Sequence, residues 1–353
     1  MKAEDAAMTV RAKKKLRVIM LVDEKLLPKG DLEDHSEKQR ELRKTEFDVK
    51  EALEALGHEV WPIGVSDDLS TIRGAIDAYK PHIAFNLVEE FQGIGRFDQH
   101  VVSYLELRRQ AYTGCNPRGL TLTRDKALTK IILAYHGLAV PKFAIFPARS
   151  KAKRPEKLAF PLFVKSLTED GSVGISGASI VHDDEKLMER IEFINRTTKS
   201  TAIVEQYVEG REIYVGVMGN DRTTVLAPWE LTMSALSPNT PLIASDRAKW
   251  DPEYQRQMGL KTGPAKLVKP LANHLAALSK QIYILLGMSG YARLDYRVTP
   301  DGKAYLLEAN PNPQIARDED FAQSAKHSGL DYEELLQQLL RFGIQRAALH
   351  PLS

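Results

Sequence analysis

The segment "YARLDYRVTPDGKAYLLEANPNPQ" (residues 291–314) places Arg293 and Asp295 in one apolar run and Glu308 and Asn310 in the next. The runs are typical of β-strands, and the Pro-Asp-Gly turn between them predicts a hairpin. Side chains alternate faces along a strand, so Arg293 and Asp295 share one face of the first strand, and Glu308 and Asn310 share one face of the second. The alternative is a surface hairpin with solvated charges, but the flanking "YLLEA" is too apolar for an exposed face.

If the two strands pair, Asp295, Glu308 and Asn310 converge on one face of the hairpin. Three hard oxygen donors suit Mg²⁺, which often completes its coordination shell with the phosphates of a substrate. The hairpin therefore predicts a magnesium site that also receives phosphate.

Composition narrows the class of protein. The chain has 353 residues, and its 49 basic and 47 acidic side chains leave a net charge of +2, which gives no electrostatic case for nucleic acid or an anionic membrane as partner. The single cysteine, Cys115, excludes an intramolecular disulfide and a cysteine-rich metal site. We expect neither a secretory signal nor a membrane span, because the first residues lack an apolar stretch and no apolar run approaches ~20 residues. A cytoplasmic enzyme is the simplest interpretation.

The pattern of elements predicts three units, 1–120, 121–201 and 202–353. In the first, short apolar strands alternate with helical stripes, which favours a parallel sheet. Residues 233–263 are rich in polar residues, Pro and Gly, and we interpret them as a long loop. Pro270 predicts a kink or a break in a helix over 264–287.

The stretch "FVKSLTEDGSVGIS" (163–176) places Lys165 at the end of a strand and Gly171, Ser172 and Gly174 in the turn that follows. Backbone N–H groups of such a turn can close around phosphate oxygens, while a lysine supplies positive charge. The lysine precedes the glycines, so this is not a Walker A motif. A flexible hairpin turn remains the alternative.

A third stretch, "IVEQYVEGREIYVGV" (203–217), joins two predicted strands through a short link. Glu205 ends the first strand, Val208 lies in the link, and Glu212 begins the second strand. Backbone groups of the link could read the edge of a base, and Glu212 could accept hydrogen bonds from ribose. An ordinary strand–turn–strand remains the alternative.

These three stretches, in this order and preceded by "TRDKALTK" (123–130), resemble the ATP-grasp superfamily, and within it the D-alanine–D-alanine ligase branch. The resemblance extends from about Tyr112 to about Leu336. It implies an ATP-grasp fold of α/β and α+β type, in which an N-terminal Rossmann-like domain precedes two subdomains that hold ATP between them.

The resemblance also implies roles for individual residues. For the nucleotide, it implies that ATP phosphates bind at Lys126, Lys165, Gly171 and Ser172, adenine at Glu205 and Val208, and ribose at Glu212. For the metal, it implies that two Mg²⁺, or Mn²⁺ in their place, bind at Asp295, Glu308 and Asn310. For the reaction, it implies that Lys249 lies near the γ-phosphate and that Arg293 stabilises the oxyanion. The implied reaction has three steps. A carboxylate attacks the γ-phosphate, an amine attacks the resulting acyl phosphate, and the tetrahedral intermediate expels phosphate to leave an amide.

The chain departs from this branch where the branch binds its amino acids. The stretch after the first strand, "VDEKLLPKGDLEDHSEKQR", has no Gly-Gly-x-Ser turn, and "PNPQIARDEDF" follows the metal motif where the branch has a glycine and a serine. Gly171 occupies the position where the branch has the first serine of a pair, and Trp250 occupies the position of a tyrosine of the branch. Arg317 could pair a substrate carboxylate, although a solvated loop charge is the alternative.

We therefore expect the same reaction class on different small-molecule carboxylate and amine substrates, and, by analogy with the family, a homodimer. The alternatives are a divergent D-alanine–D-alanine ligase and a nucleotide-binding pseudoenzyme that acts as a scaffold. Intact acidic, amide and basic residues at the expected ATP and metal positions count against the pseudoenzyme.

Overall fold

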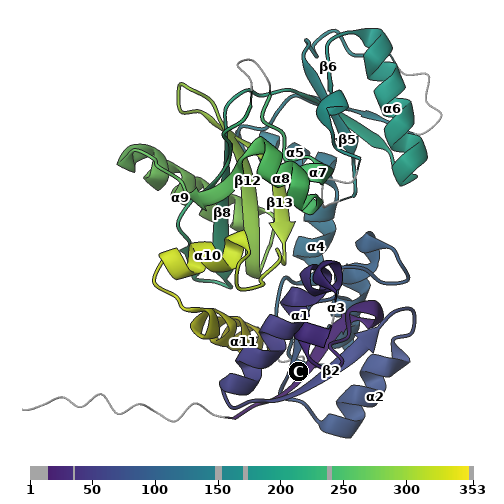
Figure 1. The fold of residues 1–353 in the computed structure, drawn as a ribbon, viewed down its shortest axis with the longest axis vertical. Coiled ribbons are helices and arrows are strands. Elements are labelled where there is room, and N and C mark those ends of the chain that lie inside the picture. Colours follow the sequence, from purple (N-terminus) through teal and green to yellow (C-terminus); the bar gives the residue numbers. More distant parts are fainter. Residues whose placement is uncertain (1–14, 35, 148–152, 170–173, 237–240, 350–353) are drawn as a thin grey trace, which may run out of the picture.

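The structure is a computed structural model that describes residues 15–34, 36–147, 153–169, 174–236 and 241–349. In this part of the chain, three sheets follow one another along the long axis of the molecule (Figure 1). The boundaries expected at residues 120 and 201 stay a prediction.

The N-terminal sheet has three parallel strands in the order β2-β1-β3, so the predicted parallel sheet is confirmed. Its central strand is buried over most of its length, as expected from its continuous apolar run. The elements of this unit are β1 (Arg17–Asp23), α1 (Glu37–Ala55), β2 (Glu59–Val65), α2 (Ser70–Tyr79), β3 (Ile83–Asn86) and α3 (Asp98–Leu107).

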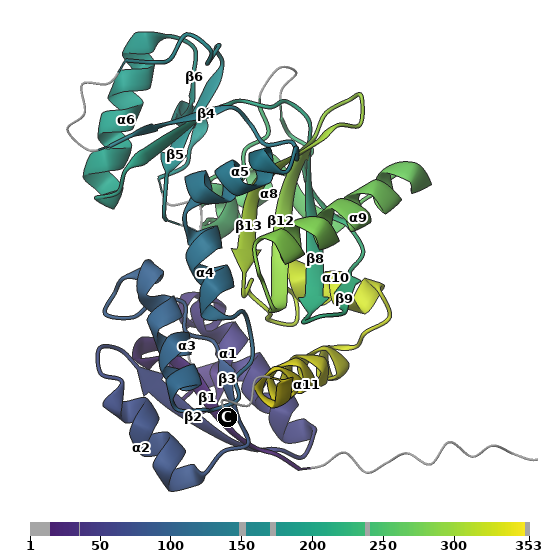
Figure 2. The ribbon, with the colours of Figure 1, turned by 180° about the vertical axis from the view of Figure 1, so that it is seen from behind.

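The last helix, α11 (Tyr332–Leu349), packs against α1 and β3 of this first unit and also contacts β12 (Gly290–Val298) of the central sheet (Figure 2). The Arg346 guanidinium fastens it there, because it donates to the carbonyl oxygens of Gly114 at 2.7 Å and of Tyr112 at 2.8 Å. The shared core includes Val18, Met20, Phe85, Leu335, Leu336, Leu339 and Leu340.

A four-stranded sheet in the order β4-β7-β5-β6 forms the opposite end of the molecule, and α6 covers one of its faces (Figure 1). Two helices, α4 and α5, lead into it from the first unit. Their bounds and those of the sheet are α4 (Pro117–Arg124), α5 (Lys126–Tyr135), β4 (Phe143–Phe146), β5 (Leu162–Ser166), β6 (Ile180–Val181), α6 (Asp184–Thr198) and β7 (Ala202–Gln206).

The central sheet has six strands, in the order β11-β10-β8-β12-β13 with β9 paired to β8. Strands β7 and β8 are consecutive in the chain but belong to different sheets, so the link between them crosses from one subdomain to the other. The remaining elements are β8 (Arg211–Gly219), β9 (Thr223–Val225), β10 (Trp229–Met233), α7 (Asp246–Trp250), α8 (Pro252–Met258), β11 (Leu260–Pro264), α9 (Lys269–Leu285), β12 (Gly290–Val298), β13 (Ala304–Pro311) and α10 (Asp320–His327).

The hairpin predicted over 291–314 is confirmed, since β12 and β13 pair as antiparallel neighbours. Asp295 lies opposite Glu308, whereas Tyr296 lies opposite Leu306. Leu307 is therefore the extra residue of a β-bulge, placed directly before one of the predicted metal ligands.

Two expectations about this region are wrong. Residues 233–263 are not a long loop, because their described part contains α7, α8 and the start of β11. The helices have five and seven residues, too short for a periodic pattern, and are started by the side chains of Ser245 and Asp251. Pro270 does not break a helix; α9 begins at Lys269, where proline's missing N–H costs nothing.

Among the described residues, no helix is both long enough and apolar enough to cross a membrane.

Candidate active site

A cavity of roughly 870 Å³, its open mouth included, lies between the four-stranded and the six-stranded sheets. Side chains from β5, β7, β8, β12, β13 and α5 line it. Nine residues expected at the site from the sequence are among them: Lys126, Lys165, Glu205, Val208, Glu212, Lys249, Arg293, Asp295 and Glu308. Gly171 and Ser172 lie outside the described residues.

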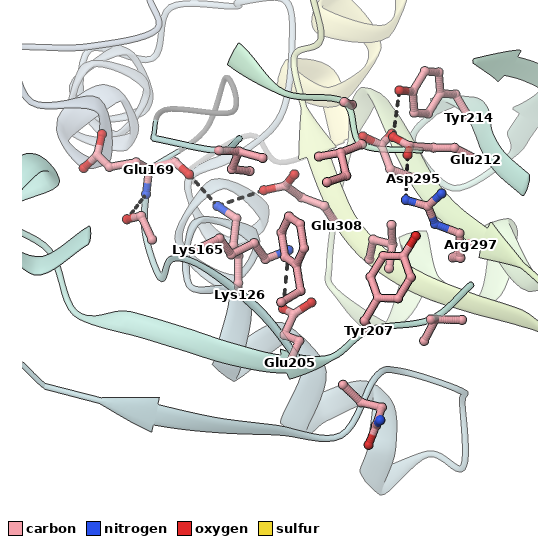
Figure 3. A pocket seen from close by; sticks show the side chains of 18 of the residues that line it. Lys126, Lys165, Glu169, Glu205, Tyr207, Glu212, Tyr214, Asp295, Arg297 and Glu308 are labelled. Carbon is pink, nitrogen blue, oxygen red and sulfur yellow. Dashed lines mark hydrogen bonds and ion pairs between the residues drawn. The ribbon is translucent and has the colours of Figure 1, made fainter. Parts of the chain in front are cut away.

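Lys126 enters the cavity from the first turn of α5. The helix begins there because the Asp125 side chain accepts from the backbone N–H groups of Ala127 and Leu128. The Lys126 ammonium is buried; it lies 2.8 Å from a Glu308 carboxylate oxygen and donates to the Glu169 carbonyl oxygen at 2.8 Å (Figure 3).

The lysines of the cavity lower the pKa of the Glu308 carboxylate. Burial by itself would raise its pKa, but the positive charges of Lys126 and Lys165 outweigh burial and hold the pKa well below its usual range. Glu308 is therefore ionised throughout the neutral pH range.

The hairpin brings the other candidate metal ligands together. The Asn310 amide donates to an Asp295 carboxylate oxygen at 2.8 Å, and the Arg293 guanidinium forms a two-point ion pair with the same carboxylate at 2.8 and 2.9 Å. Arg293 also lies over the Tyr214 ring, 4.5 Å from its centroid.

The residues present fit Mg²⁺ chemically. No three His, Cys, Asp or Glu side chains of the described chain gather as a metal site, so the candidate set is two carboxylates and one amide. All three offer hard oxygen ligands. The ammonium of Lys126 lies 2.8 Å from Glu308, which shows that a positive charge is stable beside these ligands.

At the other side of the cavity, Glu212 is held by two groups (Figure 3). The Arg297 guanidinium lies 2.8 Å from one of its carboxylate oxygens, and the Tyr214 hydroxyl donates to the other at 2.9 Å. Arg297 also donates to the carbonyl oxygens of Gly210 and Leu242. The carboxylate expected at ribose is thus fixed in one orientation.

Sequence reasoning missed two buried cations of this site, Arg297 and Lys130. Arg297 falls two residues after Asp295, on the face already assigned to the site, so strand alternation could have found it. Lys130 lies one turn after Lys126 on α5, and its ammonium is 3.3 Å from a Glu205 carboxylate oxygen. The signal in the sequence was the four-residue spacing of Lys126 and Lys130, which places both side chains on one face of the helix.

A second and larger cavity, about 2230 Å³ with its open part, adjoins the first. Both are lined by Glu169, Tyr214, Ala244, Lys249 and Arg293, and Asn310 lines only the second. Eight acidic and four basic side chains line this second cavity, so its wall carries a surplus of negative charge.

Arg317 lines neither cavity. Its guanidinium lies 2.9 Å from a Glu333 carboxylate oxygen and over the Tyr332 ring, so it is engaged with α11. Its acidic neighbours do line the second cavity, where Lys44 of α1 pairs with Asp318 and Glu319.

Comparisons with known proteins agree on a single family. The family model "D-ala D-ala ligase C-terminus" matches residues 132–341. A D-alanine–D-alanine ligase of Nitratidesulfovibrio vulgaris is 30% identical over 300 residues, covering 85% of this chain and 92% of that protein. The uncharacterized protein y4sG of Sinorhizobium fredii is 32% identical over 259 residues, covering 73% of each chain.

Solved structures show the same fold. The D-alanine–D-alanine ligase of Bacillus anthracis, complexed with ATP, superposes with a TM-score of 0.74 at 22% identity and covers 95% of this chain and 99% of that one. The VanG D-Ala:D-Ser ligase of Enterococcus faecalis gives a TM-score of 0.67 at 17% identity, covering 94% and 100%.

The fold is therefore ATP-grasp with an N-terminal Rossmann-like domain, and the class is an ATP-dependent carboxylate–amine ligase acting on small molecules. More narrowly, the chain belongs to the D-alanine–D-alanine ligase family. Enzymes of this family use ATP and Mg²⁺, which agrees with the lysines and oxygen ligands of the first cavity.

Proposed function

We propose that this ligase joins the carboxylate of one amino acid, or amino-acid derivative, to the amine of a second, and that D-alanine is not its preferred substrate. One observation carries the proposal. The paired Lys126 and Glu308, together with the cluster of Arg293, Asp295 and Asn310, stand where the first cavity meets the second.

The first cavity would receive ATP. In this proposal Lys126, Lys165, Gly171 and Ser172 bind the phosphates. The segment from Glu205 to Val208 lies along adenine, and Glu212 accepts from ribose. The positive charge of the lysines at one end of the cavity, and the fixed carboxylate of Glu212 at the other, support this orientation of the nucleotide.

Asp295, Glu308 and Asn310 would hold two Mg²⁺. Bound there, the ions neutralise the charge that develops on the transferred phosphoryl group. The two carboxylates are held by cations of the chain, Asp295 by Arg293 and Glu308 by Lys126, so their oxygens keep a fixed direction before metal and nucleotide arrive.

Catalysis would proceed in two transfers. A substrate carboxylate oxygen attacks the γ-phosphorus, the bond to the bridging oxygen breaks, and ADP leaves. The amine nitrogen then attacks the acyl carbon, phosphate leaves with its bonding electron pair, and the amine gives up its proton as the amide forms. Lys249 supports the γ-phosphate, and Arg293 faces the oxyanion, where a single donor is worth ~3 kcal/mol.

The substrates are expected to differ from D-alanine because the family's amino-acid positions are changed. The Gly-Gly-x-Ser turn of the family has no counterpart in "VDEKLLPKGDLEDHSEKQR", and its later glycine and serine have none in "PNPQIARDEDF". A buried substrate charge that is left unpaired costs several kcal/mol, so such changes alter specificity. The acidic surplus of the second cavity adds basic amino acids to the candidates worth testing.

The decisive experiment is a phosphate-release screen with ATP and Mg²⁺ over pairs of L- and D-amino acids and small amino-acid derivatives, with mass spectrometry of the products. A Glu308→Gln variant is the matched negative control. We expect an amide product with a pair other than D-alanine with itself.

The second candidate, D-alanine–D-alanine ligase, rests on the names of the relatives. It replaces the proposal if D-alanine alone gives the highest kcat/KM, at roughly 10⁴ M⁻¹s⁻¹ or more.

We further propose a cytoplasmic location, a homodimer, and three structural units over 1–120, 121–201 and 202–353. Sedimentation equilibrium measures the oligomeric state, and limited proteolysis tests the two unit boundaries.

A further inference from the structure

Lys130 is a buried lysine that does not line the cavity. Its side chain is 1% exposed, and it lies on α5 one turn after Lys126, beneath the cavity's floor. An ammonium so deeply removed from water is costly unless other groups of the protein compensate its charge. The groups that do so identify what Lys130 holds in place.

The first of these groups is the β-bulge of the hairpin. The Lys130 ammonium donates to the carbonyl oxygen of Leu307 at 2.7 Å, and Leu307 is the residue without a partner in the β12–β13 register. Bulges next to active sites re-aim the neighbouring side chain. Here the neighbour is Glu308, so Lys130 fastens the backbone that aims a candidate metal ligand.

The second group is Glu205 of β7. Its carboxylate oxygen Oε1 is 3.3 Å from the ammonium of Lys130 and 3.3 Å from that of Lys165, so one buried carboxylate is shared by two lysines. If Lys130 were absent, Lys165 would be the one ion-pair partner left to Glu205 among the residues that the structure describes. Lys165 would then pair with Glu205, and its positive charge would attract a phosphate less strongly.

We propose, building on the function proposed above, that Lys130 is a positioning residue with two effects. It neutralises Glu205, which leaves the charge of Lys165 for the nucleotide phosphates. It also fixes the bulge at Leu307, which keeps Glu308 directed at Mg²⁺. A single side chain that touches no substrate thereby links the β7 side of the cavity to its metal end.

The test measures ADP binding by calorimetry, which requires no knowledge of the amino-acid substrates. Lys130→Met should weaken ADP binding at saturating Mg²⁺ by roughly tenfold or more, as expected for a charge withdrawn from phosphate. It should also raise the Mg²⁺ concentration needed for half-maximal ADP affinity by about threefold or more. Lys50→Met is the matched control, because Lys50 pairs with Glu54 at 3.0 Å on α1, outside both cavities, and should change neither value.

A double variant separates positioning from a merely structural role. Lys130→Met combined with Glu205→Gln removes the carboxylate that would capture Lys165, so ADP affinity should return to within about threefold of Glu205→Gln alone. The shift in Mg²⁺ requirement should persist, since the contact with Leu307 is still lost. The double variant leaves no carboxylate without its cation, and Lys165 still faces the negative charge of Glu308, so the test stays valid if the single variant fails to fold.

Two results overturn the inference. One is unchanged ADP affinity in a folded Lys130→Met protein; the other is a double variant whose ADP affinity stays tenfold below that of Glu205→Gln. A wild-type protein that binds no ADP would instead overturn the proposed function and this inference with it.

Discussion

Replacing Arg297 by methionine should destabilise the protein and weaken its hold on nucleotide. Arg297 and Glu212 form an ion pair at 2.8 Å in which both side chains are only 7% exposed. Methionine has nearly the length of the arginine stem but carries no charge, so the substitution leaves the Glu212 carboxylate buried without its cation. The Tyr214 hydroxyl remains as its hydrogen-bond donor.

The structure sets the size of the effect. Removing one partner of a buried ion pair costs about 3–5 kcal/mol of unfolding free energy. Two carbonyl oxygens, of Gly210 and Leu242, also lose a donor. A double variant, Arg297→Met with Glu212→Gln, buries no unpaired charge and should lose only about 1–2 kcal/mol, the value of those two hydrogen bonds.

Urea denaturation followed by circular dichroism measures the stabilities, and calorimetric titration with ADP measures binding. The matched control is Arg211→Met, which breaks the ion pair between Arg211 of β8 and Glu230 of β10. The Arg211 side chain is 40% exposed, so the loss should stay below about 1 kcal/mol. Both variants at position 297 should bind ADP more weakly, because Glu212 is either misdirected or replaced.

The reasoning fails if Arg297→Met costs no more than Arg211→Met. It also fails if the double variant is less stable than the single one. Either result would mean that water reaches the Arg297–Glu212 pair and that its burial does not determine its energy.

The remaining predictions address metal, phosphate and pH. Glu308→Gln removes a charge with little change of volume, so ATP-dependent phosphate release should fall by at least roughly 10³-fold while the circular dichroism spectrum is unchanged; substantial residual activity would exclude Glu308 as a metal ligand. Lys165→Ala should weaken ADP binding by roughly tenfold or more in calorimetry, and an unchanged affinity would assign Lys165 a structural role. Burial, followed by nearby carboxylates, raises the pKa of Glu46 from 4.5 to about 8. Between these values the folded state binds the extra proton, so stability falls as pH rises through this window, and Glu46→Gln should be more stable than wild type at pH 9 by as much as about 5 kcal/mol in urea denaturation; equal stability would show that Glu46 is solvated.

The candidate site was predictable where the pattern is local. Alternation and a Pro-Asp-Gly turn are enough to pair β12 with β13 and to bring Arg293, Asp295 and Asn310 together, because strand geometry determines which side chains share a face. The first parallel sheet was predicted from a different signal, the alternation of short apolar strands with helical stripes, which favours parallel strands.

What the sequence did not reveal depends on partners far away in the chain. Lys130 contacts a carbonyl 177 residues away, and Arg297 contacts a carboxylate 85 residues away, so neither shows locally that it is buried and paired. The role of Arg317 stays a prediction. Its place just after the metal motif suggested a substrate ligand, whereas α11 offers it Glu333 and Tyr332 instead.

The docking of α11 on the first sheet has a consequence for the biogenesis of the protein. A ribosome makes β1, β2 and β3 long before it makes α11, yet the apolar side chains of Val18 and Phe85 are covered by leucines of that helix. The sheet of β1, β2 and β3 thus acquires its complete core only after α11 has been synthesised. Until α11 is made, this sheet presents an apolar surface, and transiently exposed surface of this kind favours aggregation.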